Sequence, residues 1–527
     1  MDHYDVAVVG AGHNALVGAC YLAKAGKKVV VLERAHVIGG AVCTEEMFGG
    51  YKVDIGSSIH VGLPLGGIVE ELGLKQYGLE YIEVDPIAFS PILGTDNGIT
   101  IWRDLDKTCA SIAAINPRDA ETYRAFMQKW AGVFRLIGPL LGGPPGKGQA
   151  LLAMLKSGAS QPGVVRQVMR DPDVARVLMM SSIRMLNEMF ESEELKAALL
   201  WMGAQHGPHP DMPGSATMLA HYGALHAHGA YRAIGGSGMA SVALGRALES
   251  MGGTILTNAA VTGIGRNGGS GPARFTVRTA EMSVSAKNVL LGCHVQTAML
   301  HLLDEELVPP VLRRRVKALN VANASGMMVR AAVSELPQYG GQPVNEGGIG
   351  ACHHGMQLLI PSMETLIRSM HLNKLGKTTE EPAIMQMSFS AIDPTLAPAG
   401  KHVLDIWTSY PPYHLDGEHW DDIAEREADR MWNMVCRYSP NMAGKLIDRY
   451  IQTPLELERR IGLVQADVTH LDMGMDQMMG RRPLPELSGY RSHIDGIFLT
   501  GASTHPGGAV SGSSGCNAAR VMLKQMA

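Results

Sequence analysis

The order of residues in the first forty positions constrains this chain most. An apolar run at 4–9 ends in a turn that holds Gly10 and Gly12, and a segment with helical apolar spacing leads to a second apolar run, 29–32, which ends at Glu33. Strand, glycine turn, helix, strand and acid in this order are typical of a unit that binds a dinucleotide. The sequence therefore predicts an α/β fold of the Rossmann type at the N-terminus.

Each residue of this motif has a physical reason. Gly10 permits the tight turn, Gly12 lets the backbone approach a pyrophosphate, and Ala15, where the strict pattern has a third glycine, is small enough for close contact between helix and strand. The helix N-terminus then faces the phosphates. The Glu33 carboxylate is expected to accept hydrogen bonds from the ribose hydroxyls of adenosine and to disfavour a 2′-phosphate.

Two later glycine clusters resemble the same pattern. Gly263-Ile-Gly265-Arg-Asn-Gly268 matches it in full, but an alternating run at 274–278 follows, which predicts a hairpin loop. Gly236-Ser-Gly238-Met-Ala-Ser241 opens a predicted helix at 239–251, and a strand at 254–256 follows without an acid at its end. We therefore expect a single dinucleotide site, and no separate NAD(P)H domain.

Composition excludes several classes of protein. The 527 residues suit more than one domain, and 46 basic against 50 acidic residues give a net charge of −4, which argues against a nucleic-acid surface. The 7 cysteines lack a Cys-x-x-Cys pair, which favours free thiols in a reducing compartment. No apolar run approaches the length of a membrane span. The sequence thus predicts a soluble, cytoplasmic protein.

The middle of the chain shows coarser patterns. Helical spacing at 104–135 and 164–200 predicts a mostly helical insertion, and the glycines and prolines of 138–148 predict a loop. Strand-like runs follow at 383–389 and 402–410. The chain is rich in methionine, with 32 residues against 8 phenylalanines, so methionine clusters could either line an apolar substrate channel or simply fill the core.

The C-terminus carries a second pattern. An apolar run at 494–499 ends in Thr500-Gly501-Ala502, a loop with His505-Pro506-Gly507-Gly508 follows, and a small-residue stretch leads into a closing helix. Together with the N-terminal motif, this resembles the phytoene desaturase and amine oxidase superfamily of FAD-dependent proteins. Within it, the motifs are similar to the desaturase-related branch, which includes carotenoid desaturases, desaturase-like ketolases and pyridine nucleotide-disulphide oxidoreductase domain proteins.

The resemblance implies a fold and a set of cofactor-binding residues. It places FAD in a Rossmann-type domain, like that of glutathione reductase, formed by 1–75, 230–300 and 485–527, and the substrate in an inserted α+β domain formed by 76–229 and 301–484. The FAD-binding positions that it implies are Gly10, Gly12, Ala15, Glu33, Arg34, Gly39, Gly40, Val261, Gly501, Ala502, Pro506, Gly507 and Gly508. One departure from many desaturases is the turn Gly292-Cys293-His294. A disulphide reductase is not expected, because its chemistry needs a cysteine pair beside the flavin.

Histidines are the candidate catalytic residues. The resemblance places His505 and His60 near the flavin, where each could exchange a proton or hydrogen-bond the flavin, or else only order its loop. The histidines from His206 to His228 lack the spacing of a metal site, so no metal is expected.

Three functions fit these motifs. The first is an FAD-dependent dehydrogenase or desaturase that takes a hydride from a hydrophobic substrate, isoprenoid-like or aromatic, and passes electrons to oxygen or a quinone. The second is a ketolase or oxidase of the same family, and the third is a flavin-binding regulatory protein with little turnover. Peripheral contact with a membrane stays an open alternative, and no nucleic-acid partner is expected.

Overall fold

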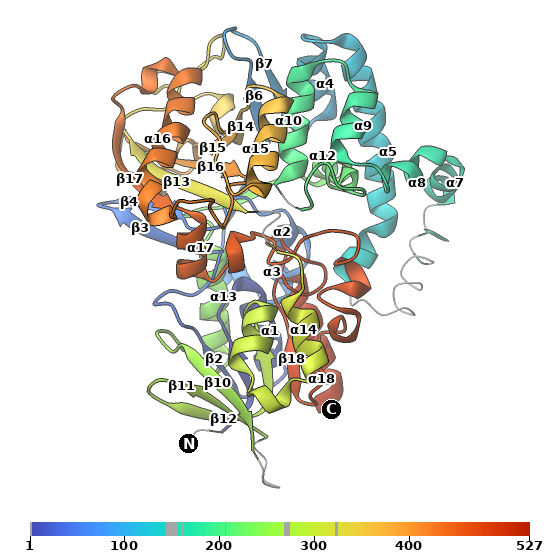
Figure 1. Ribbon diagram of the computed structural model, residues 1–527, viewed down its shortest axis with the longest axis vertical. Helices are drawn as coiled ribbons and strands as arrows, with labels where there is room; N and C mark the ends of the chain where they lie inside the picture. The colour runs from blue at the N-terminus through green and yellow to red at the C-terminus, as the bar shows by residue number, and fades with distance from the viewer. Residues whose placement is uncertain are drawn as a thin grey trace.

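The computed structural model describes residues 3–143, 156, 158–159, 162–205, 207–267, 274–321 and 325–527. Two β-sheets organise these residues, one toward each end of an elongated molecule (Figure 1). Both termini lie at the end that holds the first sheet (Figure 1).

The first sheet contains the N-terminal motif. Its strands are β1 (His3–Val9), β2 (Val29–Leu32), β9 (Thr254–Leu256), β10 (Val261–Arg266), β11 (Phe275–Thr279), β12 (Ser283–Leu291) and β18 (Ile497–Leu499). They lie in the order β10-β11-β12-β1-β2-β9, and β18 also pairs with β12. The pairs among β1, β2, β9, β12 and β18 are parallel, whereas β10 and β11 form an antiparallel hairpin. The α/β fold is confirmed. The glycine pattern at 263–268 leads into a hairpin and opens no helix at its described residues, as predicted, but Gly263 and Gly265 lie within strand β10 and not in the loop. Gly268 lies outside the described residues.

Helices cover both faces of this sheet, as a parallel sheet requires. Val6 and Val8 of β1 pack in one apolar cluster with α1 (His13–Lys24), α13 (Met239–Ser250) and α18 (Ser513–Met526), while Ala7 and Val9 pack on the other face with α14 (Pro310–Lys317). These four β1 side chains are at most 4% exposed.

The first and last helices touch backbone to backbone. A Cβ built on Gly515 of α18 would lie 1.9 Å from the backbone carbonyl oxygen of Asn14 in α1, and one built on Gly18 would lie 3.3 Å from the Gly515 carbonyl oxygen. Only glycine permits this approach. The closing helix is therefore fixed against the helix that follows the glycine turn.

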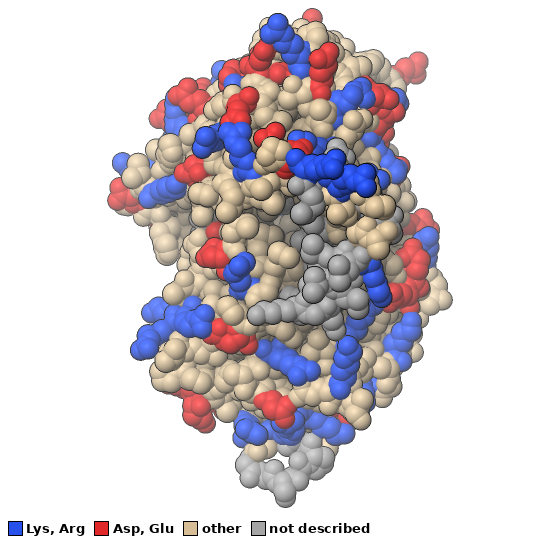
Figure 2. All heavy atoms as spheres, turned by 90° about the vertical axis from the view of Figure 1, so that its right-hand side faces the viewer, with Lys and Arg blue, Asp and Glu red and all other residues tan. Residues whose placement is uncertain are grey.

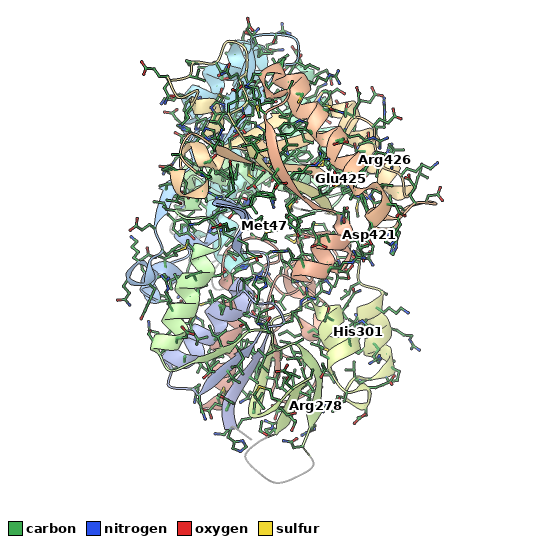
Figure 3. The ribbon with its side chains drawn as sticks, turned by 90° about the vertical axis from the view of Figure 1, so that its left-hand side faces the viewer. Met47, Arg278, His301, Asp421, Glu425 and Arg426 are labelled. Atoms are coloured by element: carbon green, nitrogen blue, oxygen red, sulfur yellow. The ribbon has the colours of Figure 1, made fainter. Side chains whose placement is uncertain are left out.

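The second sheet is mostly antiparallel. Its strands are β6 (Ala88–Pro91), β7 (Gly98–Ile101), β13 (Gly326–Val333), β14 (Met356–Leu359), β15 (Ile384–Met387), β16 (His402–Ser409) and β17 (Leu446–Gln452). Their order is β17-β13-β16-β15-β14-β6-β7, with β14 and β6 parallel. Helix α16 (Trp420–Tyr438) packs on one face, and its charged side, with Asp421, Glu425 and Arg426, points outward (Figure 3).

The other face of the second sheet packs against a helical region. Its helices are α4 (Leu105–Ala113), α5 (Pro117–Gly142), α7 (Pro162–Arg170), α8 (Pro172–Val177), α9 (Ser182–Met189), α10 (Glu193–Ala204), α11 (Ala216–Ala220), α12 (Tyr222–His228) and α15 (Met363–Lys374). The predicted helical insertion is confirmed. The predicted loop at 138–148 is wrong at its start, because the apolar spacing of 133–141 carries α5 through to Gly142. Residues 144–148 lie outside the described residues.

Short elements connect the two sheets. They are β3 (Thr44–Phe48), β4 (Tyr51–Asp54), β5 (Tyr81–Glu83), β8 (Tyr231–Ala233), α2 (Gly62–Leu65), α3 (Ile68–Glu71) and α17 (Pro454–Ile461). On the face seen in Figure 2, basic and acidic side chains are interspersed. Within the described ranges, none of the helices has the length and apolar character that crossing a membrane needs.

Candidate functional site

The turn between β1 and α1 leaves an opening for an anion. Gly10 has a φ of +88°, Gly12 precedes the first residue of α1, and no side chain of the described residues caps this helix. A Cβ built on Gly12 would have no described atom within 4 Å. The backbone N–H of Gly39 donates to the carbonyl of Ala11 at 2.8 Å, which holds the Gly39–Gly40 segment against the turn. Free N–H groups at a helix start beside open space form an anion site.

Ala15 is accommodated by a glycine on the neighbouring strand end. A Cβ built on Gly292 would lie 2.6 Å from the Cβ of Ala15, too close for two carbon atoms. The departure at Gly292 and the departure at Ala15 therefore compensate for each other, and the helix stays close to the strand.

Glu33 is fixed at the end of β2. It is 8% exposed; its Oε2 accepts from the Ala11 N–H at 2.6 Å, and its Oε1 accepts from the Ala35 N–H at 2.9 Å. The carboxylate is thus held beside the turn, where ribose hydroxyls would reach it.

Arg34 points elsewhere. Its side chain is exposed, and its guanidinium lies 3.4 Å from the Glu458 carbonyl oxygen at the end of α17. A Cβ built on Gly462 would be 3.1 Å from the same guanidinium. In the structure Arg34 therefore contacts α17, and its predicted contact with the cofactor stays a prediction. Val261 begins β10 and is half-buried.

The C-terminal loop is held by a cluster of hydroxyl groups. Ser514, in the first turn of α18, lies 3.0 Å from the Thr500 hydroxyl and 2.6 Å from the Thr504 hydroxyl, and it accepts from the Gly501 N–H at 3.0 Å. Gly501 and Gly507 have φ values of +94° and +112°, which side-chain-bearing residues rarely adopt. The loop that begins at the end of β18 therefore returns to the start of α18 beside α1.

Arg482 is a buried residue that the sequence patterns did not indicate. Its guanidinium is 0% exposed and donates to the backbone carbonyls of Thr469, Leu471, Asp472, Gln477 and Ala502, at distances from 2.7 to 3.2 Å. Burial lowers its pKa to about 10, so it stays charged at neutral pH. This side chain joins the segment 469–477 to the C-terminal loop.

The two candidate catalytic histidines differ in their surroundings. His60 is fully buried, with Nδ1 at 2.8 Å from the Tyr81 hydroxyl and Nε2 at 2.7 Å from the Ser237 hydroxyl, and burial lowers its pKa to about 3. His505 is 1% exposed, and its backbone carbonyl accepts from the Tyr490 hydroxyl at 2.9 Å. His505 lies in the same loop as Gly507, whereas His60 is hydrogen-bonded to Ser237, just before α13.

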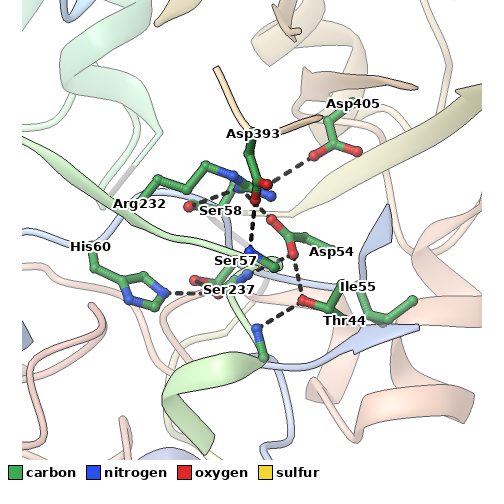
Figure 4. Close-up of polar contacts among 12 residues, drawn as sticks. Thr44, Asp54, Ile55, Ser57, Ser58, His60, Arg232, Ser237, Asp393 and Asp405 are labelled. Atoms are coloured by element: carbon green, nitrogen blue, oxygen red, sulfur yellow. Dashed lines mark hydrogen bonds and ion pairs between the residues drawn. The ribbon is translucent and has the colours of Figure 1, made fainter. Parts of the chain in front are cut away.

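A buried network of charges joins the two halves of the molecule (Figure 4). Asp54 of β4 accepts from Arg232 of β8 at 2.5 Å and from the Ser237 N–H at 2.9 Å. On the second sheet, Arg330 lies 3.2 Å from Asp405, whose pKa is raised by burial. Arg330 also donates to the backbone carbonyl of residue 55, which follows β4. These residues are far apart in sequence, so no local pattern could have paired them.

Other chemistries find little support. All seven cysteines are free in the structure. In the described part of the chain, no cluster of three or more His, Cys, Asp or Glu residues could hold a metal ion. The open glycine turn, the uncapped helix and the fixed Glu33 together fit the diphosphate and ribose of FAD.

Comparisons with known proteins agree with this site. Residues 8–71 match the family model of the NAD(P)-binding Rossmann-like domain. The chain is 31% identical to pyridine nucleotide-disulfide oxidoreductase domain-containing protein 2 of Rattus norvegicus, over 99% of this chain and 94% of that protein. It is 27% identical to one of the subunits of limonene dehydrogenase from Castellaniella defragrans, over 99% and 95% of the two chains. Cyclohexylamine oxidase of Brevibacterium oxydans has the same fold, with a TM-score of 0.61 at 16% identity and 99% coverage of each chain.

The fold and site define an FAD-dependent oxidoreductase of the desaturase and amine oxidase superfamily. Within it, the chain belongs to the family of pyridine nucleotide-disulfide oxidoreductase domain-containing protein 2.

Proposed function

We propose that the chain removes a hydride from a hydrophobic substrate, isoprenoid-like or aromatic, and transfers it to N5 of the bound flavin. The observation that carries this proposal is the position of Met473. A Cβ built on Gly507 would lie 2.6 Å from the Met473 sulfur, so this side chain lies directly on the C-terminal loop. A Cβ built on Gly207 would lie 3.2 Å from the Met473 Cβ and 3.3 Å from the Met218 sulfur, so both methionines adjoin Gly207. An apolar, adaptable surface therefore borders the loop at Met473.

The relatives support the same class of substrate. Limonene, which gives one relative its name, is an isoprenoid hydrocarbon. A hydrocarbon offers no acid or base of its own, so the protein must orient it and exclude water. A methionine-bordered loop suits this task better than a charged one.

FAD, when bound, supplies the electron-accepting chemistry. We propose His505 as the residue that exchanges a proton or hydrogen-bonds the flavin, because it lies in the loop that holds Gly507. A proton-carrying role for His60 stays a prediction, since both of its ring nitrogens are already hydrogen-bonded to protein hydroxyls. Oxygen or a quinone is the proposed electron acceptor, and peripheral membrane contact remains part of the proposal for an apolar substrate.

Anaerobic reduction of the bound flavin tests the proposal. Limonene, phytoene, an aromatic alcohol and a cyclic amine would each be mixed with the yellow protein, and we expect the isoprenoids to bleach it. Met473→Gln should slow this bleaching by about tenfold or more if the lost apolar contact is worth about 1.4 kcal/mol in the transition state. The control is Met475→Gln, because Met475 is 49% exposed.

Each alternative has its own outcome. Bleaching by the amine but by neither isoprenoid would favour an oxidase and contradict the proposal. A yellow protein that no substrate bleaches would favour a regulatory flavoprotein.

A further inference from the structure

His13 stands beside the expected site of the FAD diphosphate. It is the first residue of α1 and follows Gly12 directly, and its side chain is half-buried. Gly10, Ala11 and Gly12 form the turn and carry no charge, so the diphosphate would meet only backbone N–H groups there. His13 is placed to add a charge that this turn lacks.

Two hydrogen-bonding groups flank the His13 ring. The backbone carbonyl of Ala509, in the C-terminal loop, faces it on one side. On the other side, the Asn14 Nδ2 lies 3.0 Å from the His13 Nε2, while the Asn14 Oδ1 is buried and has no partner among the described residues. Asn14 is only 4% exposed. A half-turn of the Asn14 amide would bring the unpartnered oxygen to Nε2.

This surrounding suits the doubly protonated ring. A neutral imidazole has one N–H donor, whereas an imidazolium has two. With the Asn14 amide turned, one N–H of the imidazolium would donate to Oδ1 and the other to the Ala509 carbonyl. A buried acceptor that lacks a partner costs free energy. Turning the amide would give the Asn14 Oδ1 a donor and would release the Asn14 Nδ2 from the ring.

Burial keeps His13 neutral until an anion arrives. The titratable groups that face it are His60, from the segment after β4, and His470, from the loop after α17; both have pKa values lowered by burial. Glu33 lies across the turn, already bound to the Ala11 N–H. Burial lowers the pKa of His13 itself to about 4.

We propose that His13 takes up a proton when FAD binds and that its positive charge then stabilises the diphosphate, while its two N–H groups donate to Asn14 and Ala509. This inference rests on the cofactor and not on the identity of the substrate. An opposite charge within about 4–6 Å shifts the pKa of a group by about 1–3 units toward its charged form, which for histidine is upward. Because the pKa is higher in the FAD complex, the added affinity is present below the pKa of the complex and is lost as pH rises above it.

The test measures binding and not turnover. The full-length protein would be stripped of FAD and titrated with FAD in a calorimeter from pH 7.5 to 5.5, in two buffers of different ionisation enthalpy. For a rise of about 2 units, the wild type should bind FAD about fourfold more tightly at pH 5.5 than at pH 7.5, and take up about half a proton at pH 6. His13→Gln should lose both effects.

The control is His36→Gln. His36 is 65% exposed and should leave the pH dependence unchanged. The proposal is overturned if the wild type binds FAD without proton uptake, or if the uptake persists in His13→Gln or in His13→Asn. A wild-type chain that bound no FAD at all would instead contradict the cofactor assignment.

Discussion

At the scale of single residues, the contact between Ala15 and Gly292 explains how the chain departs from the strict glycine pattern. We expect Gly292→Ala to destabilise the first sheet by about 1–3 kcal/mol, because two Cβ atoms would be forced together. Ala15→Gly should cost about 0.5–1 kcal/mol alone, since glycine is a poor helix former, yet it should recover part of the loss in the Gly292→Ala background. Thermal unfolding of the four proteins of this cycle measures the coupling, and simple additivity would contradict it.

Local residues of the site were predictable, and distant ones were not. Gly10, Gly12 and Glu33 follow one another at a spacing that is visible in the sequence. Their positions depend only on a tight turn and on the end of a strand, and both are local structures with few possible conformations. Arg482 gives no such pattern because its acceptors are backbone carbonyls, which any residue type supplies. Arg232 gives none because its partner Asp54 lies far away in the chain. The contact of Arg34 with α17 depends in the same way on tertiary packing.

At the scale of elements, the hydrogen bonds of Arg482 hold the segment 469–477 against the C-terminal loop. We expect Arg482→Met to lower the free energy of unfolding by about 3–5 kcal/mol, since several buried carbonyls would lose their donor. FAD retention should fall with it, because the loop that holds Gly501 and Gly507 would lose its support. Gel filtration with absorbance of the bound flavin measures retention.

The neighbouring arginine provides a matched control. Arg481 is exposed, and its guanidinium makes a long contact with the Met475 carbonyl at 3.4 Å. Arg481→Met should change stability by less than about 0.5 kcal/mol. If both variants kept FAD equally well, the buried Arg482 would not be the link that we infer.

Elements with a long, regular pattern were predicted well, and element ends were not. Strand β11, with its alternating residues, and helix α5, with apolar residues three and four apart, each carry a spacing that allows one periodicity. The end of α5 was misjudged because Gly138 and Pro139 normally stop a helix, whereas here the apolar spacing on both sides of them continued it.

At the scale of the whole molecule, the Asp54–Arg232 pair joins the connection after the N-terminal motif to the segment before α13. Both side chains are at most 2% exposed. Arg232→Met should destabilise the protein by about 3–5 kcal/mol, because the buried Asp54 carboxylate would lose its partner. The double variant Asp54→Leu with Arg232→Met should cost less than Arg232→Met alone, because it leaves no buried charge unpaired. Thermal melts compare the variants, and the exposed pair Arg368–Glu364 is the control, since Arg368→Met should have almost no effect.

Buried neutral histidines should make the whole molecule sensitive to acid. Burial lowers the pKa values of His60, His209 and His294 to about 3, 4 and 4. The unfolded chain binds protons at these positions below about pH 6.5, while the folded chain does not until pH 4 or lower. Protonation therefore favours the unfolded chain as pH falls, so the free energy of unfolding is highest above about pH 6.5 and decreases below it. Summed over the three, the loss should be about 3 kcal/mol between pH 6.5 and 5.5.

Urea unfolding of the FAD-free protein at these two pH values measures this loss. The FAD-free form is needed because proton uptake by His13 would make FAD binding tighter over the same range and so oppose it. His60→Gln keeps a hydrogen-bonding side chain but cannot titrate, so it should reduce the loss between pH 6.5 and 5.5 by about 1 kcal/mol. A stability that did not change between pH 6.5 and 5.5 would mean that these histidines are protonated in the folded protein, which would contradict their burial as neutral rings.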